Sequence, residues 1–97
     1  MRSLKEVEDV LRENKKELKR RFGVSKIGIF GSYASGKANN HSDIDILVDI
    51  ERPSGIFELM ELQDYLAKLL GRKIDITTSG SLKQLIKKEI LSQTVYV

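Results

Sequence analysis

The chain has 97 residues, of which 40% are hydrophobic and 32% are charged, and its formal net charge is +3. This length fits one small domain over residues 1–97, and the balance is that of a folded globular protein. The absence of cysteine excludes a disulfide framework, a thiolate metal site and a cysteine nucleophile. A charged, amphipathic N-terminus and the lack of a long apolar run predict a cytoplasmic protein with no membrane span.

The excess positive charge is concentrated in one segment that contains Lys15, Lys16, Lys19, Arg20 and Arg21. The simpler interpretation is the solvated face of a helix, and the alternative is a patch that binds a polyanion. A modest positive charge also suits a triphosphate ligand. Nucleic-acid binding is therefore an unlikely but open alternative, which salt-dependent binding to DNA or RNA would favour.

The first half of the chain begins with a predicted helix over Ser3–Phe22, in which Asn14 interrupts the apolar stripe. Ser3 and Glu6 form a capping box at its start, and Gly23 fits a left-handed helix end. The elements predicted next are a strand over Val24–Phe30, one helical turn over Ser32–Gly36, a polar loop over Lys37–Ser42 and a strand over Asp43–Ile50.

The second half opens with a loop over Glu51–Gly55 that contains the only proline. After it we predict a helix over Ile56–Leu70, a strand over Lys73–Thr77, a helix from Leu82 to about Leu91 capped by Ser81 with Gln84, and a short edge strand over Thr94–Val97. The order α-β-(short α)-β-α-β-α predicts an α/β (α+β) fold, with helices packed on a small mixed sheet.

Three aspartates carry the chemistry that the sequence suggests. Asp43 and Asp45 are two residues apart on a strand and therefore point to one face, opposite the apolar face of Ile44 and its alternate neighbours. Asp75 has an equivalent place in the strand Lys73–Thr77, so all three converge if the two strands are adjacent. Carboxylates alone, without His or Cys, favour Mg²⁺ or Mn²⁺ over Zn²⁺. Aspartates at a solvated strand end are the simpler alternative.

A Gly-Ser pair, Gly31-Ser32, closes the preceding strand. Glycine allows the backbone to approach a phosphate, and Ser32 offers a hydroxyl and an N–H group near a helix start. By itself this pair is also typical of an ordinary turn. The run from Gly31 to Lys37 matches most of the P-loop pattern, but Ala38 occupies the place of the metal-binding hydroxyl, which argues against a P-loop.

In combination, Gly31-Ser32, ten further residues, Asp43-Ile44-Asp45 and the later Asp75 resemble the nucleotidyltransferase superfamily of DNA polymerase beta. More narrowly, the chain resembles the minimal nucleotidyltransferases that act as antitoxins beside HEPN-domain toxins. The resemblance covers nearly the whole chain. It implies a nucleotidyltransferase fold and an enzyme that transfers AMP from ATP to a tyrosine of the partner toxin. A hetero-oligomer with that partner is a further expectation from the resemblance.

The resemblance also implies roles for individual residues. Asp43, Asp45 and Asp75 are the expected catalytic residues and metal ligands, for two Mg²⁺ ions or for Mn²⁺, and Asp75 is expected to help deprotonate the acceptor. Gly31 and Ser32 are expected to hold the β- and γ-phosphates. Many relatives have an arginine where this chain has Ser35, and Lys37 is expected to supply the missing phosphate contact.

Two other functions remain open from the sequence. A catalytically silent antitoxin would act by binding alone, and the intact aspartate trio argues against it. A small-molecule nucleotidyltransferase usually needs additional helical elements, for which 97 residues leave no room. Three further residues have a simple interpretation: His41 as a surface residue, Asp49 as a strand-end charge, and Tyr33 as either a packing or a base-stacking group.

Overall fold

The computed structural model describes residues 3–51 and 55–97. Its elements are α1 (Leu4–Glu13), α2 (Lys15–Phe22), β1 (Val24–Phe30), α3 (Gly31–Ser35), β2 (Ile44–Ile50), α4 (Ile56–Leu70), β3 (Ile74–Thr78), a 3-10 turn η1 (Ser79–Ser81), α5 (Gln84–Gln93) and β4 (Val95–Tyr96). The predicted order of helices and strands is confirmed, including the short edge strand at the end. Residues 52–54 of the predicted loop lie outside the described ranges.

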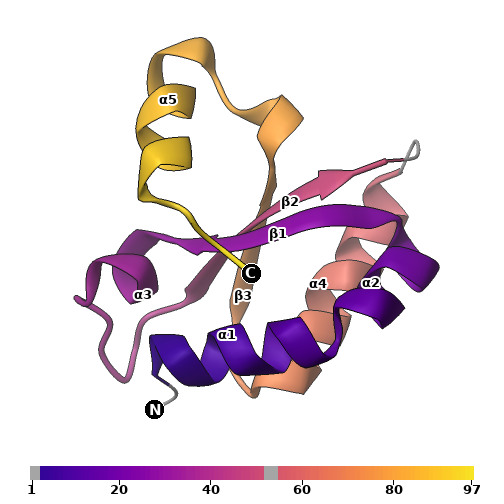
Figure 1. Cartoon of the computed structure of the whole chain (residues 1–97), viewed down its shortest axis with the longest axis horizontal. Coiled ribbons are helices and arrows are strands. Elements are labelled where there is room, and N and C mark those ends of the chain that lie inside the picture. The colour runs from indigo at the N-terminus through magenta and orange to yellow at the C-terminus, as the bar shows by residue number, and fades with distance from the viewer. Residues whose placement is uncertain (1–2, 52–54) are drawn as a thin grey trace.

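The strands form one mixed sheet in the order β3-β2-β1-β4. β1 is antiparallel to both β2 and β4, whereas β2 and β3 are parallel. In Figure 1, α1 and α4 lie below β1, while α5 lies above it. No helix in the described part of the chain is long and apolar enough to cross a membrane.

One face of the sheet packs against α1, α2 and α4 and forms the hydrophobic core. β2 contributes Ile44, Ile46 and Val48, none of them more than 1% exposed, as the alternation of apolar residues predicts. The helices α1, α2 and α4 add seven apolar side chains to this core: Val7, Leu11, Leu18, Phe22, Leu62, Leu66 and Leu70. This apolar face fixes the register of β2 and so turns the aspartates to the other side.

The predicted helix over Ser3–Phe22 is in fact two helices that meet at Asn14. The Asn14 side-chain amide donates to the Val10 carbonyl at 2.8 Å, and the Asn14 backbone N–H donates to Leu11 instead. This side chain therefore takes the carbonyl that a continuous helix would use for its own backbone. The capping box of Ser3 and Glu6 is confirmed.

The predicted capping box of Ser81 and Gln84 is wrong. The Ser81 hydroxyl donates to the Thr78 carbonyl at 2.9 Å, at the 3-10 turn, and the helix begins two residues too late for Ser81 to be its N-cap. α5 begins after Lys83, which provides no side-chain cap, and it extends to Gln93 rather than Leu91. None of its residues is buried, and α3 is the element that α5 contacts most.

The C-terminal segment returns across β1 at Gly28. A Cβ atom at this position would lie 2.4 Å from Thr94 Cγ2 and 3.2 Å from the Val95 carbonyl oxygen. Residues directly opposite in a sheet share a face, and Gly28 is paired with Leu47. Thr94 therefore covers the β1 side of the aspartate face, and leaves the beginnings of β2 and β3 uncovered by this segment.

Candidate active site

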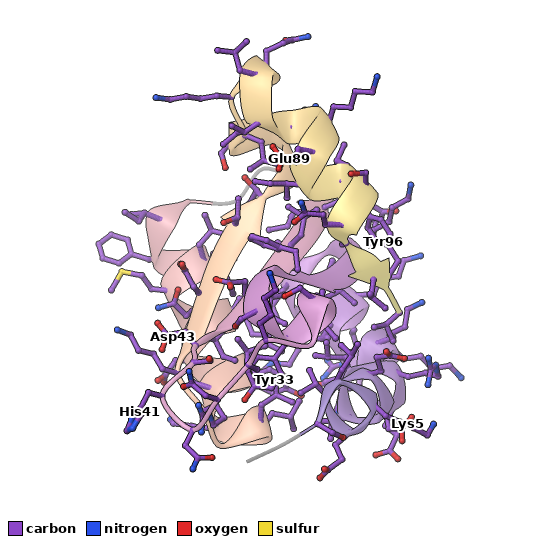
Figure 2. All side chains as sticks on the ribbon, turned by 90° about the vertical axis from the view of Figure 1, so that its left-hand side faces the viewer. Lys5, Tyr33, His41, Asp43, Glu89 and Tyr96 are labelled. Atoms are coloured by element: carbon purple, nitrogen blue, oxygen red, sulfur yellow. The ribbon has the colours of Figure 1, made fainter. Side chains whose placement is uncertain are left out.

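Three aspartates lie where β2 and β3 begin. Asp45 and Asp75 are partners in the parallel register, so the predicted adjacency of the two strands is confirmed and the side chains share a face. Asp43 precedes β2 by one residue. It is half-buried, like Asp45, whereas Asp75 is exposed. In Figure 2, Asp43 lies toward one end of the visible face, next to the loop of His41, and Glu89 of α5 marks the other end.

Burial raises the pKa of the Asp45 carboxyl above its ordinary value, and the negative charges of Asp75 and Asp43 raise it further. The only nearby cation with a contact to this trio among the described residues is Lys73, whose Nζ is 4.0 Å from Asp43 Oδ2. The Lys73 side chain is 82% exposed, so its attraction is largely screened by water. The site therefore has more negative charge than its own side chains neutralise.

No three His, Cys, Asp or Glu side chains in the described ranges are arranged so that they could hold a metal ion as they stand. The donor chemistry nevertheless suits a hard divalent cation, because the nearby groups are carboxylate oxygens. The raised pKa of Asp45 also favours a cation site, because a cation between the carboxylates would relieve their repulsion.

Gly31 is packed directly against Asp45. Its φ is +70°, and a Cβ atom here would lie 2.1 Å from Asp45 Oδ2. There are therefore two reasons for glycine at this position: the left-handed backbone and the close approach of the Asp45 carboxylate. The sequence predicts a glycine turn at this point, but the contact with Asp45 depends on the pairing of β1 with β2, in which Phe30 lies opposite Asp45.

The predicted helical turn after Gly31 is α3, which ends at Gly36 with a φ of +77°. The Lys37 backbone N–H donates to the Ser32 carbonyl at 2.9 Å, which folds the chain back on itself. Gly31 and Lys37 then line one cavity of about 500 Å³, together with Ala34, Ser35 and Gln93. The structure thus brings Lys37 and Gly31 together, and adds Gln93 of α5, which the sequence did not indicate.

The loop before Asp43 is held by a residue that the sequence analysis missed. Arg72 Nη2 donates to the carbonyl oxygens of Ser42, at 2.5 Å, and Asn39, at 3.3 Å. Asn39 also accepts from the His41 backbone N–H at 2.8 Å through its side chain. Arg72 therefore ties the segment before β2 to the beginning of β3. Nothing in the sequence distinguishes it from an ordinary surface arginine.

The remaining candidates have the simpler of their interpretations. His41 is exposed on the loop. Asp49 accepts a hydrogen bond from the Ser79 hydroxyl near the end of β2. Tyr33 is 2% exposed and packs in the core, so base stacking by its ring is excluded in this structure. In the basic segment, Arg20 pairs with Glu17, and Arg21 lies over an aromatic ring of the core at 5.1 Å.

The electrostatic strain at Asp45 leads to a stability prediction for the protein without added metal. A raised pKa means that the folded state binds the proton more tightly than the unfolded state, so ionisation of Asp45 destabilises the fold above that pKa. We expect Asp45→Asn to raise Tm near neutral pH, by roughly 2–4 °C after allowance for solvent screening. The difference from wild type should shrink as the pH falls and Asp45 becomes protonated in both the folded and the unfolded state.

Thermal melts of both proteins between about pH 4 and 8, with chelator present, measure this difference. Asp75→Asn is a useful companion variant, because it removes one of the charges that act on Asp45. If the Tm of Asp45→Asn at neutral pH were equal to or lower than that of wild type, ionised Asp45 would not destabilise the metal-free fold, and the prediction would be wrong.

Residues 11–97 match the nucleotidyltransferase domain family. The chain is 47% identical to protein adenylyltransferase MntA of Thermococcus cleftensis, over the whole of this chain and 98% of that protein. It is 42% identical to MJ0126 of Methanocaldococcus jannaschii, over the full length of both, and that protein is provisionally named a protein adenylyltransferase.

Solved structures agree with these relatives. The fold matches a structure provisionally described as a minimal nucleotidyltransferase with a TM-score of 0.81 and 29% identity, over 97% of this chain and 95% of that one. It also matches a chain in a toxin–antitoxin structure with AMP-PNP, with a TM-score of 0.70 and 25% identity, over 96% of this chain and 70% of that one.

Proposed function

The chain belongs to the nucleotidyltransferase domain family, and from that premise we propose that it transfers AMP from ATP to a tyrosine hydroxyl of a HEPN-domain toxin and thereby acts as its antitoxin. The observation that carries this proposal is the parallel register of Asp45 with Asp75, beside Gly31 and on the uncovered part of the sheet. The relatives named as protein adenylyltransferases and the toxin–antitoxin structure support the choice of a protein acceptor.

Asp43, Asp45 and Asp75 are the residues that would hold the divalent cations, which we propose to be two Mg²⁺ ions, with Mn²⁺ as a substitute. When bound, the ions activate the attacking oxygen and stabilise the leaving oxygen. The excess of negative charge at Asp45 supports this assignment, because bound cations would neutralise it.

The reaction forms a bond between the tyrosine oxygen and the α-phosphorus of ATP, and breaks the bond from that phosphorus to the β-phosphate oxygen, so that pyrophosphate leaves. Asp75 is proposed to accept the hydroxyl proton, since it is the exposed member of the trio. Orientation of the acceptor contributes a large share of the rate, and we propose that the partner supplies it, because Asp75 is exposed at the surface.

Gly31 and Ser32 are proposed to bind the β- and γ-phosphates. This assignment is supported by Gly31, which packs against Asp45 and also lines the cavity of Lys37. Ser35 cannot make the phosphate contact of the arginine found in many relatives. Lys37, in the same cavity, is proposed to replace it as a point charge.

The decisive experiment incubates the chain with MgATP and the product of the adjacent gene, which we propose to be a HEPN-domain protein, and then measures the intact mass of both proteins. We expect little product from the chain alone. With the partner present, we expect the partner to become heavier by one or more AMP groups, located on tyrosine by peptide mapping. A partner that binds but is never modified would support the silent antitoxin instead. Rapid transfer to free small molecules would also contradict the proposal.

A further inference from the structure

The first turns of α4 expose large apolar side chains. Ile56 is 69% exposed, Phe57 77% and Met60 59%, whereas Leu62 and Leu66 further along the helix are buried in the core. Single exposed apolar residues are common, but a cluster on one stretch of helix is typical of an interaction surface. These three side chains do not contribute to the hydrophobic core. Packing within the fold therefore does not explain why they are large and apolar.

The exposed side chains border a groove between α4 and the open edge of β3. Two adjoining cavities of about 520 and 320 Å³ form it, and Met60 and Gln63 line both. Ile74 and Ile76 of β3 form its floor, one in each cavity. We name this feature the α4–β3 groove. Its apolar length, from Ile56 to Ala67 on the helix, suits an amphipathic helix laid into it.

The α4–β3 groove is next to the aspartates because β3 contributes residues to both. Successive residues of a strand point to opposite faces, so Asp75 lies between Ile74 and Ile76 but on the site side. β3 is an edge strand, which leaves only one strand between the groove and Asp45. Lys73 lines the groove, and its ammonium is also the contact of Asp43 at 4.0 Å.

Acidic side chains lie along the groove and beyond its β3 side. Glu61 and Asp64 line it on the helix side, where Asp64 is paired with Lys68 at 3.2 Å, and the aspartate trio lies beyond Lys73, which is 4.0 Å from Asp43. An apolar partner surface flanked by Lys or Arg would complement it. A second copy of this chain fits less well, because a symmetric contact would bring Glu61 and the aspartate trio of both copies to one interface.

We propose that the α4–β3 groove is the docking surface of the acceptor protein, which seats an amphipathic helix with basic flanks in it and so brings its hydroxyl to Asp75. This inference rests on the proposed function for the identity of the acceptor. The partner then covers the edge of β3 and adds the missing wall of the site.

The test measures binding of the HEPN partner by calorimetry for Phe57→Glu and for Leu85→Glu. Leu85 is the matched control, because it is 94% exposed but lies on α5. We expect Phe57→Glu to weaken binding at least a hundredfold and Leu85→Glu to bind within threefold of wild type. Both side chains are largely exposed, so thermal melts should show folded proteins. At saturating partner, Phe57→Glu should recover its transfer rate, which separates docking from chemistry.

Equal binding by Phe57→Glu and wild type, or loss of binding in Leu85→Glu alone, would overturn the docking surface. So would a wild-type chain that sediments as a dimer and that Phe57→Glu makes monomeric, or a wild-type chain that does not bind the partner. Failure of the proposed function is a different result: the wild type binds the partner through Phe57 but transfers no AMP to it.

Discussion

Asp45→Asn should lower the rate of AMP transfer by about 10²–10³-fold, which corresponds to roughly 2.7–4 kcal/mol of barrier. The substitution keeps the size of the side chain and removes the charge that a cation needs. Because the same change relieves repulsion in the metal-free fold, activity should fall while Tm rises, a combination that general damage to the structure does not produce. Transfer to the HEPN partner, followed by intact mass at early times, gives the rate.

Asp49→Asn is the matched control on the same strand and the same face. Asp49 Oδ1 accepts from the Ser79 hydroxyl, and an asparagine retains that acceptor. We expect its transfer rate to stay within about threefold of wild type, since it has no place in the proposed site. If Asp49→Asn lost as much activity as Asp45→Asn, the charge of the whole face, rather than a particular cation site, would be responsible.

Gly31→Ala should lose both stability and activity. The left-handed backbone costs a side chain roughly 1–2 kcal/mol, and the crowding of the new methyl group adds roughly 1–3 kcal/mol. A Cβ at Gly31 would lie 2.1 Å from Asp45 Oδ2, so the carboxylate must move. We therefore expect a transfer rate reduced about as much as in Asp45→Asn, about 10²-fold or more. Urea unfolding and the transfer assay measure the two effects.

Gly36→Ala separates backbone strain from the crowding of Asp45. Gly36 also has a positive φ, +77°, but nothing lies within 4 Å of a Cβ built there. It should lose stability by roughly 1–2 kcal/mol from strain alone and keep most of its activity. Equal activity losses in the two variants would show that the approach of Gly31 to Asp45 is not what the site requires.

The sequence predicts the helices and strands well because their apolar residues recur at the spacing of one face. Its errors are at two polar side chains. Asn14 takes a carbonyl from the helix backbone, and Ser81 bonds within the preceding turn. Each of these two side chains has several possible hydrogen-bond partners of similar local geometry. The spacing of apolar residues does not predict which partner it takes.

The sequence by itself determined the order of the elements, the shared face of Asp43 and Asp45, and the glycine turn, since each depends on neighbours along the chain. Only the tertiary structure decided which strands are adjacent, and with this the pairing of Asp45 with Asp75 and the packing of Gly31 on the Asp45 carboxylate. It also decided the bonds of Arg72 to the Ser42 loop and the groove beside Phe57. These contacts join residues far apart in sequence, whose distances are set by sheet register and core packing rather than by local preference.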